Sequence, residues 1–133
     1  MSDRFFRRAL LATAVMNVFG AVVLSPPFPL VRRLFGVPEA PPLYGWLLAL
    51  WILFFGIGYW RLARAHTPER LFLQVAAAGK ASFPLVLAVY WLAGDLPVAA
   101  PLSASPDLAF AALFAARLWG TRPLESHPSQ ILN

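Results

Sequence analysis

The sequence predicts an all-α protein, a transmembrane four-helix bundle, and three observations favour it. Hydrophobic residues make up 59% of the 133 and charged residues only 13%, whereas a soluble domain carries roughly 25% charged residues. Four apolar stretches reach the about 20 residues that a helix needs to cross a bilayer. Arginines gather at those ends of the stretches that share one side. This composition excludes an ordinary soluble domain and a disordered chain, and the continuous apolar runs exclude the alternating strands of a membrane barrel.

The first helix is predicted at about residues 6–25, where an uncharged run follows Arg8 and is stopped by Pro26 and Pro27. Basic residues before an apolar run also fit a signal peptide, but no small-residue cleavage motif precedes Ser25, so a retained helix is favoured. A proline-rich outer loop follows. Its segment 30–35 fits a turn of helix in the headgroup region and a plain loop equally well.

The second and third helices are predicted at about residues 43–63 and 69–94. Thr67, Pro68 and Glu69 fit the N-cap, the first position and the acidic first turn of the third helix.

The fourth helix is predicted at about residues 97–119. Ser105, Pro106 and Asp107 also form a helix-start signature, so a second interpretation is a short helix after a kinked or re-entrant segment 97–105. Residues 1–120 then form a single domain, and residues 121–133 a flexible cytoplasmic tail.

Orientation is predicted from the basic residues. One side of the membrane collects eight arginines and the other only Arg32 and Arg33. The eight are Arg4, Arg7, Arg8, Arg61, Arg64, Arg70, Arg117 and Arg122. Because basic residues favour the inside, both termini are expected to be cytoplasmic in a multi-pass protein of a bacterial inner membrane. Aromatic residues agree with this orientation, with Tyr59 and Trp60 expected at the inner interface and Tyr44 and Trp46 at the outer one.

Six of these arginines are expected to set the topology and to meet lipid headgroups. They are Arg7, Arg8, Arg61, Arg64, Arg70 and Arg117.

Two charges lie near the middle of predicted spans, far from the helix ends. Lys80 stands ten residues after Arg70, and Asp107 ten residues before Arg117, so both lie about 15 Å from the inner interface. The third and fourth helices are consecutive and antiparallel, which predicts a Lys80–Asp107 ion pair. Asn17 lies about 13.5 Å deep and is expected in the same polar layer. The pair is interpreted either as structural or as a binding site, because intramembrane charges commonly mark function.

The residue types restrict the chemistry. There is no cysteine, and His66 and His127 lie outside the apolar stretches, so no metal, haem, other cofactor or catalytic residue is predicted. The leading hypothesis is a structural or accessory membrane subunit. The alternative is a binder or carrier of a lipophilic or anionic small molecule, and an enzyme is the weakest hypothesis. The expected partners are the lipid bilayer and a homo-oligomer or another membrane protein, because Gly56 and Gly58 favour close helix packing; nucleic acid is not expected.

Three short motifs carry a resemblance to known proteins. They are Gly79–Lys80, the segment Tyr90-Trp91-Leu92-Ala93-Gly94-Asp95-Leu96-Pro97, and Asp107-Leu108-Ala109-Phe110-Ala111. Together they resemble a set of small, uncharacterised bacterial four-helix membrane proteins, and size and topology are loosely similar to DoxX-like proteins. The resemblance implies a four-helix bundle and no particular reaction. DoxX-like membrane isomerases use acidic and histidine side chains, and this chain has no intramembrane histidine or glutamate.

Overall fold

The computed structural model describes residues 2–65 and 69–120, and in these ranges it is all-helical. The helices are α1 (Asp3–Leu24), α2 (Pro29–Leu34), α3 (Pro42–Arg64), α4 (Arg70–Leu92), α5 (Ala99–Ser103) and α6 (Ser105–Gly120). Among the described residues, α1, α3 and α4 are long and apolar enough to cross a membrane. Large apolar side chains such as Val15, Phe54 and Leu85 are exposed on them, a surface that suits lipid rather than water. The predicted helical class is confirmed, and three of the described helices are long and apolar enough to span a membrane.

The first helix starts earlier than predicted, and the loop after it contains a short helix. α1 begins at Asp3, earlier than predicted, because the Ser2 hydroxyl accepts a hydrogen bond from the Phe5 amide at 3.3 Å and caps the helix. It ends at Leu24, before Pro26 and Pro27. Of the two interpretations of segment 30–35, the helical one holds, since α2 forms there with Pro29 at its first position.

The start of α4 differs from the prediction. Glu69 is the residue before the helix and its side chain makes no capping hydrogen bond, so it does not lie in the first turn; the predicted N-cap Thr67 and Pro68 lie outside the described residues. Within α4, Pro84 has no N–H to donate to the carbonyl of Lys80 four residues earlier. The helix ends at Leu92, where Gly94 has a φ of 88° and the Asp95 amide bonds the Tyr90 carbonyl at 2.9 Å.

The fourth predicted helix is divided. α5 stops at Ser103 and α6 starts at Ser105, because Pro106 cannot bond the carbonyl of Leu102 and its ring opposes a continuous helix. α6 has 16 residues, which corresponds to about 24 Å. The interpretation with a short final helix after a separate segment is therefore the one the structure shows.

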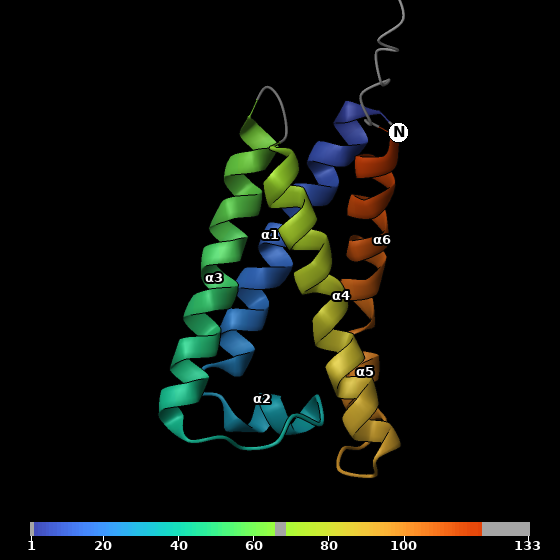
Figure 1. Ribbon diagram of the computed structural model, residues 1–133. Coiled ribbons are helices and arrows are strands. Elements are labelled where there is room, and N and C mark those ends of the chain that lie inside the picture. The colour runs from blue at the N-terminus through green and yellow to red at the C-terminus, as the bar shows by residue number, and fades with distance from the viewer. Residues whose placement is uncertain (1, 66–68, 121–133) are drawn as a thin grey trace, which may run out of the picture.

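The long helices pack as two pairs, α1 with α3 and α4 with α6 (Figure 1). α2 lies across one end of the molecule next to α1, and α5 packs against α4 and α6. At the opposite end lie the start of α1, the end of α3, the start of α4 and the end of α6. We call this the N-terminal end, and the other the α2 end.

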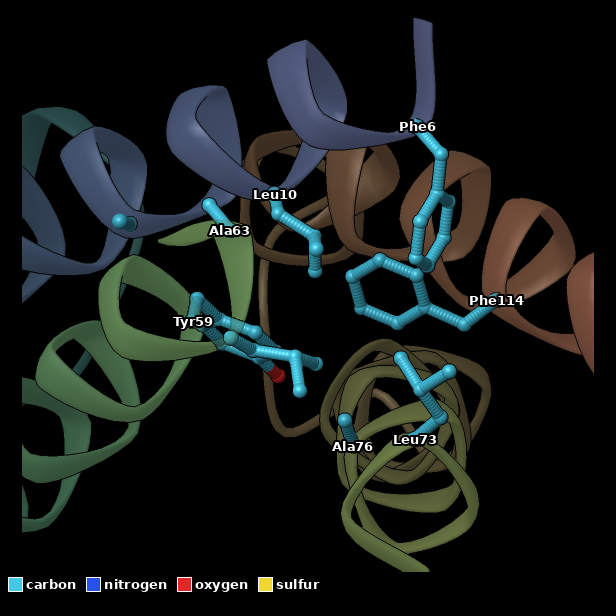
Figure 2. Packing of buried hydrophobic residues seen from close by; sticks show 9 residues of the cluster. Phe6, Leu10, Tyr59, Ala63, Leu73, Ala76 and Phe114 are labelled. Atoms are coloured by element: carbon cyan, nitrogen blue, oxygen red, sulfur yellow. The ribbon is translucent and has the colours of Figure 1, made fainter. Parts of the chain in front are cut away.

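The two pairs meet in a hydrophobic core near the N-terminal end (Figure 2). Phe6 and Leu10 come from α1, Tyr59 from α3, Leu73 from α4 and Phe114 from α6. The Phe114 ring stands edge-on to Phe6 at 6.2 Å between centroids and 5.6 Å from the Tyr59 ring. Such aromatic contacts add to the burial of area, so this cluster holds the two pairs together.

Two glycines allow close approach between helices. A Cβ at Gly56 would lie 3.2 Å from the Asn17 Cβ on α1, and a Cβ at Gly58 would lie 2.6 Å from the Phe72 ring of α4. Both glycines are thus used for packing within the chain.

Candidate functional site

Three polar side chains from three helices meet between the two pairs, and we call them the polar cluster. The Lys80 ammonium on α4 donates to Asn17 Oδ1 on α1 at 2.6 Å and to Asp107 Oδ1 on α6 at 2.6 Å. The side chains of Lys80 and Asp107 are 10% and 16% exposed. The contact predicted from equal depth on neighbouring helices is present, and Asn17 belongs to the same cluster.

Asn17 is held in one orientation by α3. Its Nδ2 donates to the Ile52 carbonyl at 3.0 Å, one turn before the glycine at position 56 that lets α1 approach α3. Because the amide nitrogen is committed to α3, the amide oxygen is left to accept from Lys80. The cluster therefore links α1, α3, α4 and α6 through one chain of hydrogen bonds.

Lys80 lies near the middle of the 23-residue α4. A buried ammonium is costly unless an opposite charge and hydrogen bonds compensate it. Asp107 supplies the opposite charge and Asn17 the second acceptor, so the ion pair is compensated within the chain.

Asp107 lies in the first turn of α6. A carboxylate at this place also faces the positive end of the helix dipole. The two sequence interpretations of Asp107, as a helix-start residue and as the partner of Lys80, are thus both present in the same side chain.

Tyr59 is a residue whose inward orientation the sequence did not predict. It was expected at the inner membrane interface, but it is 1% exposed in the core, with its ring 5.9 Å from the Lys80 ammonium. Among the described residues its hydroxyl has no hydrogen-bond partner. Tyr59 and Trp60 are neighbours in the sequence, so on a helix they point in different directions. Trp60 faces outward, but the sequence alone does not show which of the two aromatic residues points inward.

A cavity of about 340 Å³ lies between the two helix pairs and reaches the polar cluster. Lys80, Asp107, Asn17 and Tyr59 line it together with apolar side chains of all four long helices, and Phe35 and Val37 after α2 line it as well. Its volume is at the lower end of the range for small-molecule sites, and such sites combine apolar walls with a few converging polar groups.

The six arginines predicted to set topology all lie at the N-terminal end. The Arg7 guanidinium donates to the Ala65 carbonyl at 3.2 Å, and Arg117 pairs with Asp3 at 2.7 Å. The Arg64 guanidinium stacks 3.8 Å from the Trp60 ring centroid. None of the six lines the cavity, so they are separate from the polar cluster.

In the part of the chain that the structure describes, no three histidine, cysteine, aspartate or glutamate side chains lie close enough together to hold a metal ion. What the arrangement offers instead is a fixed set of hydrogen-bonding groups at the inner end of an apolar cavity. Such a site can hold the polar end of a molecule whose remainder is hydrophobic.

Comparisons with protein-family models, curated proteins and solved structures give no match for this chain. The resemblance to small bacterial four-helix membrane proteins stays an expectation.

Proposed function

We propose that the chain is a four-helix protein of a bacterial inner membrane that binds a lipophilic small molecule in the cavity between its helix pairs. The observation that carries the proposal is the cavity of about 340 Å³ that ends at Lys80, Asp107 and Asn17. A purely structural ion pair needs no space beside it. Here apolar walls lead to polar groups, which is the arrangement of ligand sites.

The membrane arrangement supports this function. α1, α3 and α4 each cross the bilayer. α5 and α6 together make the fourth crossing, because α6 alone is shorter than the other three helices. The arginines at the N-terminal end favour the cytoplasm for that end, so both termini are inside and α2 lies at the outer surface. The cavity then occupies the outer half of the bilayer, between the polar cluster and α2.

Copurification tests the binding function. The protein is purified in mild detergent, and the lipophilic molecules it retains are extracted and quantified by mass spectrometry. The Lys80→Met/Asp107→Leu double variant is compared with Ser82→Ala, which removes a hydroxyl of α4 that is exposed and bonds only the Gly79 carbonyl of its own helix.

We expect one molecule to be enriched with the wild type and with Ser82→Ala and to be lost from the double variant. Equal recovery from all three proteins contradicts binding at the polar cluster.

A second candidate function is that of a structural or accessory subunit. It is favoured because Lys80 already has two acceptors within the chain and needs no ligand to compensate its charge. The same double variant separates the two. A structural role requires only that the chain folds, so a folded double variant still supports its cellular partner; a binding role fails in that folded variant.

A further inference from the structure

The charges that line the cavity cancel. Lys80 is positive, Asp107 is negative, and the other polar lining residues, Asn17, Tyr59 and Ser103, are neutral. The pair is closed at 2.6 Å. A ligand with a charged end would add an uncompensated charge to a site surrounded by apolar side chains, where unpaired charges are strongly disfavoured.

Hydrogen-bonding capacity nevertheless remains at the cluster. An ammonium has three N–H donors, and Lys80 uses two of them on Asn17 and Asp107. Among the described residues, the second carboxylate oxygen of Asp107 accepts no hydrogen bond. The Tyr59 hydroxyl neither donates nor accepts one within the same part of the chain. The site therefore offers donors and an acceptor without net charge, which matches a carbonyl or hydroxyl group.

Access to the cavity is lateral. α3 and α4 approach near the N-terminal end, where Gly58 contacts Phe72, and they diverge toward the α2 end (Figure 1). Leu48 and Trp51 on α3 and Phe83 on α4 line the cavity and are themselves exposed. They stand in the central turns of their helices, at the depth of lipid chains.

We propose that the cavity takes an uncharged lipophile with a carbonyl or hydroxyl group at one end, which enters from the bilayer between α3 and α4. This inference rests on the proposed binding function. The polar end reaches Lys80, Asp107 and Tyr59, and the hydrophobic remainder passes Trp51 and Phe83 into lipid, because the cavity alone is too small to enclose a long chain.

The test uses Trp51 as the reporter. Trp46, Trp60, Trp91 and Trp119 are exposed, so they are changed to Phe and the full chain with Trp51 alone is placed in lipid nanodiscs. Four probes share one brominated 16-carbon chain, which quenches tryptophan on contact, and differ in the head: hydroxyl, methyl ester, ionised carboxylate or trimethylammonium. A second protein that keeps only Trp119 measures unspecific partitioning.

Two variants at neighbouring positions of α4 locate the site. Gly79 lines the cavity, and a Cβ there meets no atom within 4 Å, so Gly79→Leu fills cavity space without forcing the helix. Ala78→Leu is the matched control, because Ala78 is exposed and does not line the cavity.

We expect saturable quenching of Trp51 by the hydroxyl and ester probes, at concentrations at least about tenfold below those for the charged probes, a preference of about 1.4 kcal/mol. Gly79→Leu is expected to abolish the saturable part and Ala78→Leu to keep it. Tighter saturation by the carboxylate or ammonium probe overturns the uncharged class while the binding function stands. Saturation that survives Gly79→Leu overturns the cavity as the site. Quenching that is linear for every probe, as for Trp119, overturns the binding function itself.

Discussion

Lys80, Asp107 and Asn17 form hydrogen bonds to one another across three helices. Substitution of one of them therefore leaves another without its partner. Removal of one charge of a buried pair leaves the second uncompensated, which costs about 3–5 kcal/mol, whereas replacement of both by apolar residues is often neutral. We therefore expect Lys80→Met and Asp107→Leu each to lower the free energy of unfolding in detergent by about 3 kcal/mol or more. The double variant is expected to regain most of this loss.

Reversible denaturant unfolding, followed by circular dichroism, measures the cycle. Single effects that simply add in the double variant would show that the two charges do not interact in the folded protein. Asp107 would then act only as a helix-start residue.

Glu39, in the loop after α2, pairs with Arg33 of α2, outside the membrane-spanning helices. Arg33 Nε donates to Glu39 Oε1 at 3.0 Å, and this hydrogen bond, with the Arg33 charge, lowers the pKa of Glu39 below its ordinary value of 4.5. Because the folded pKa is the lower one, the contact contributes above the ordinary pKa and is lost as the pH falls through the lowered value. We expect Arg33→Gln to return the pKa of Glu39 toward 4.5, as measured by NMR titration of its carboxyl carbon. An unchanged titration would remove Arg33 as the cause.

Single residues also show how far the sequence could lead. Lys80, Asp107 and Asn17 could be predicted, because a rise of 1.5 Å per residue converts sequence position into depth and equal depth predicts contact. Tyr59 and the cavity could not. Both depend on how far α3 and α4 diverge, and that divergence is set by the contact of Gly58 with Phe72 and by the aromatic core, which arise only when all four long helices are packed.

At the level of elements, Gly36, just after the end of α2, lies close to the opposite helix pair. Gly36 has a φ of 67°, and a Cβ there would lie 2.9 Å from Pro97 and 3.1 Å from the Ala100 amide nitrogen. α2 therefore bridges from α1 to the start of α5 at the outer end of the cavity. Its helical form was one of two equal interpretations of the sequence, because a six-residue helix leaves little periodic signal.

Replacement of Gly36 tests this bridge. Gly36→Ala is expected to cost about 2–4 kcal/mol, from the left-handed backbone and the crowding together. Gly94→Ala is the matched control: Gly94 also has a positive φ, 88°, but its Cβ would meet no atom within 4 Å, so about 1–2 kcal/mol is expected. Unfolding midpoints in detergent measure both. Equal losses would mean that the contact with Pro97 and Ala100 contributes nothing.

The division of the last predicted helix was partly foreseeable. Ser105, Pro106 and Asp107 carry the usual signature of a helix start, yet the apolar run from 97 to 119 is long enough for one continuous span. The proline decides between them, because its missing N–H weakens any continuous helix at that point. Hydrophobicity alone does not report such a break.

In the whole molecule, most of the described arginines and the start of the chain lie at the N-terminal end. Arg32 and Arg33 of α2, and Asp95 after α4, lie at the α2 end. This distribution predicts the orientation in the membrane. Alkaline phosphatase is active only outside the cytoplasm, so fusion after Phe35 is expected to be active and fusion after Ala65 inactive. The opposite pattern would reverse the proposed orientation.

The break at Ala104 has a consequence for water. Ala104 and Pro106 line the cavity, the carbonyl of Leu102 has no amide at Pro106 to bond, and the first amides of α6 lack acceptors within their own helix. Polar backbone groups so placed are commonly hydrated, so we expect water at this end of the cavity. In deuterated buffer, the amide of Leu108 is expected to exchange faster than those of Leu53 and Phe54 at the middle of α3. We expect this water on one side of the bundle, beside α6, in an otherwise mainly apolar cavity.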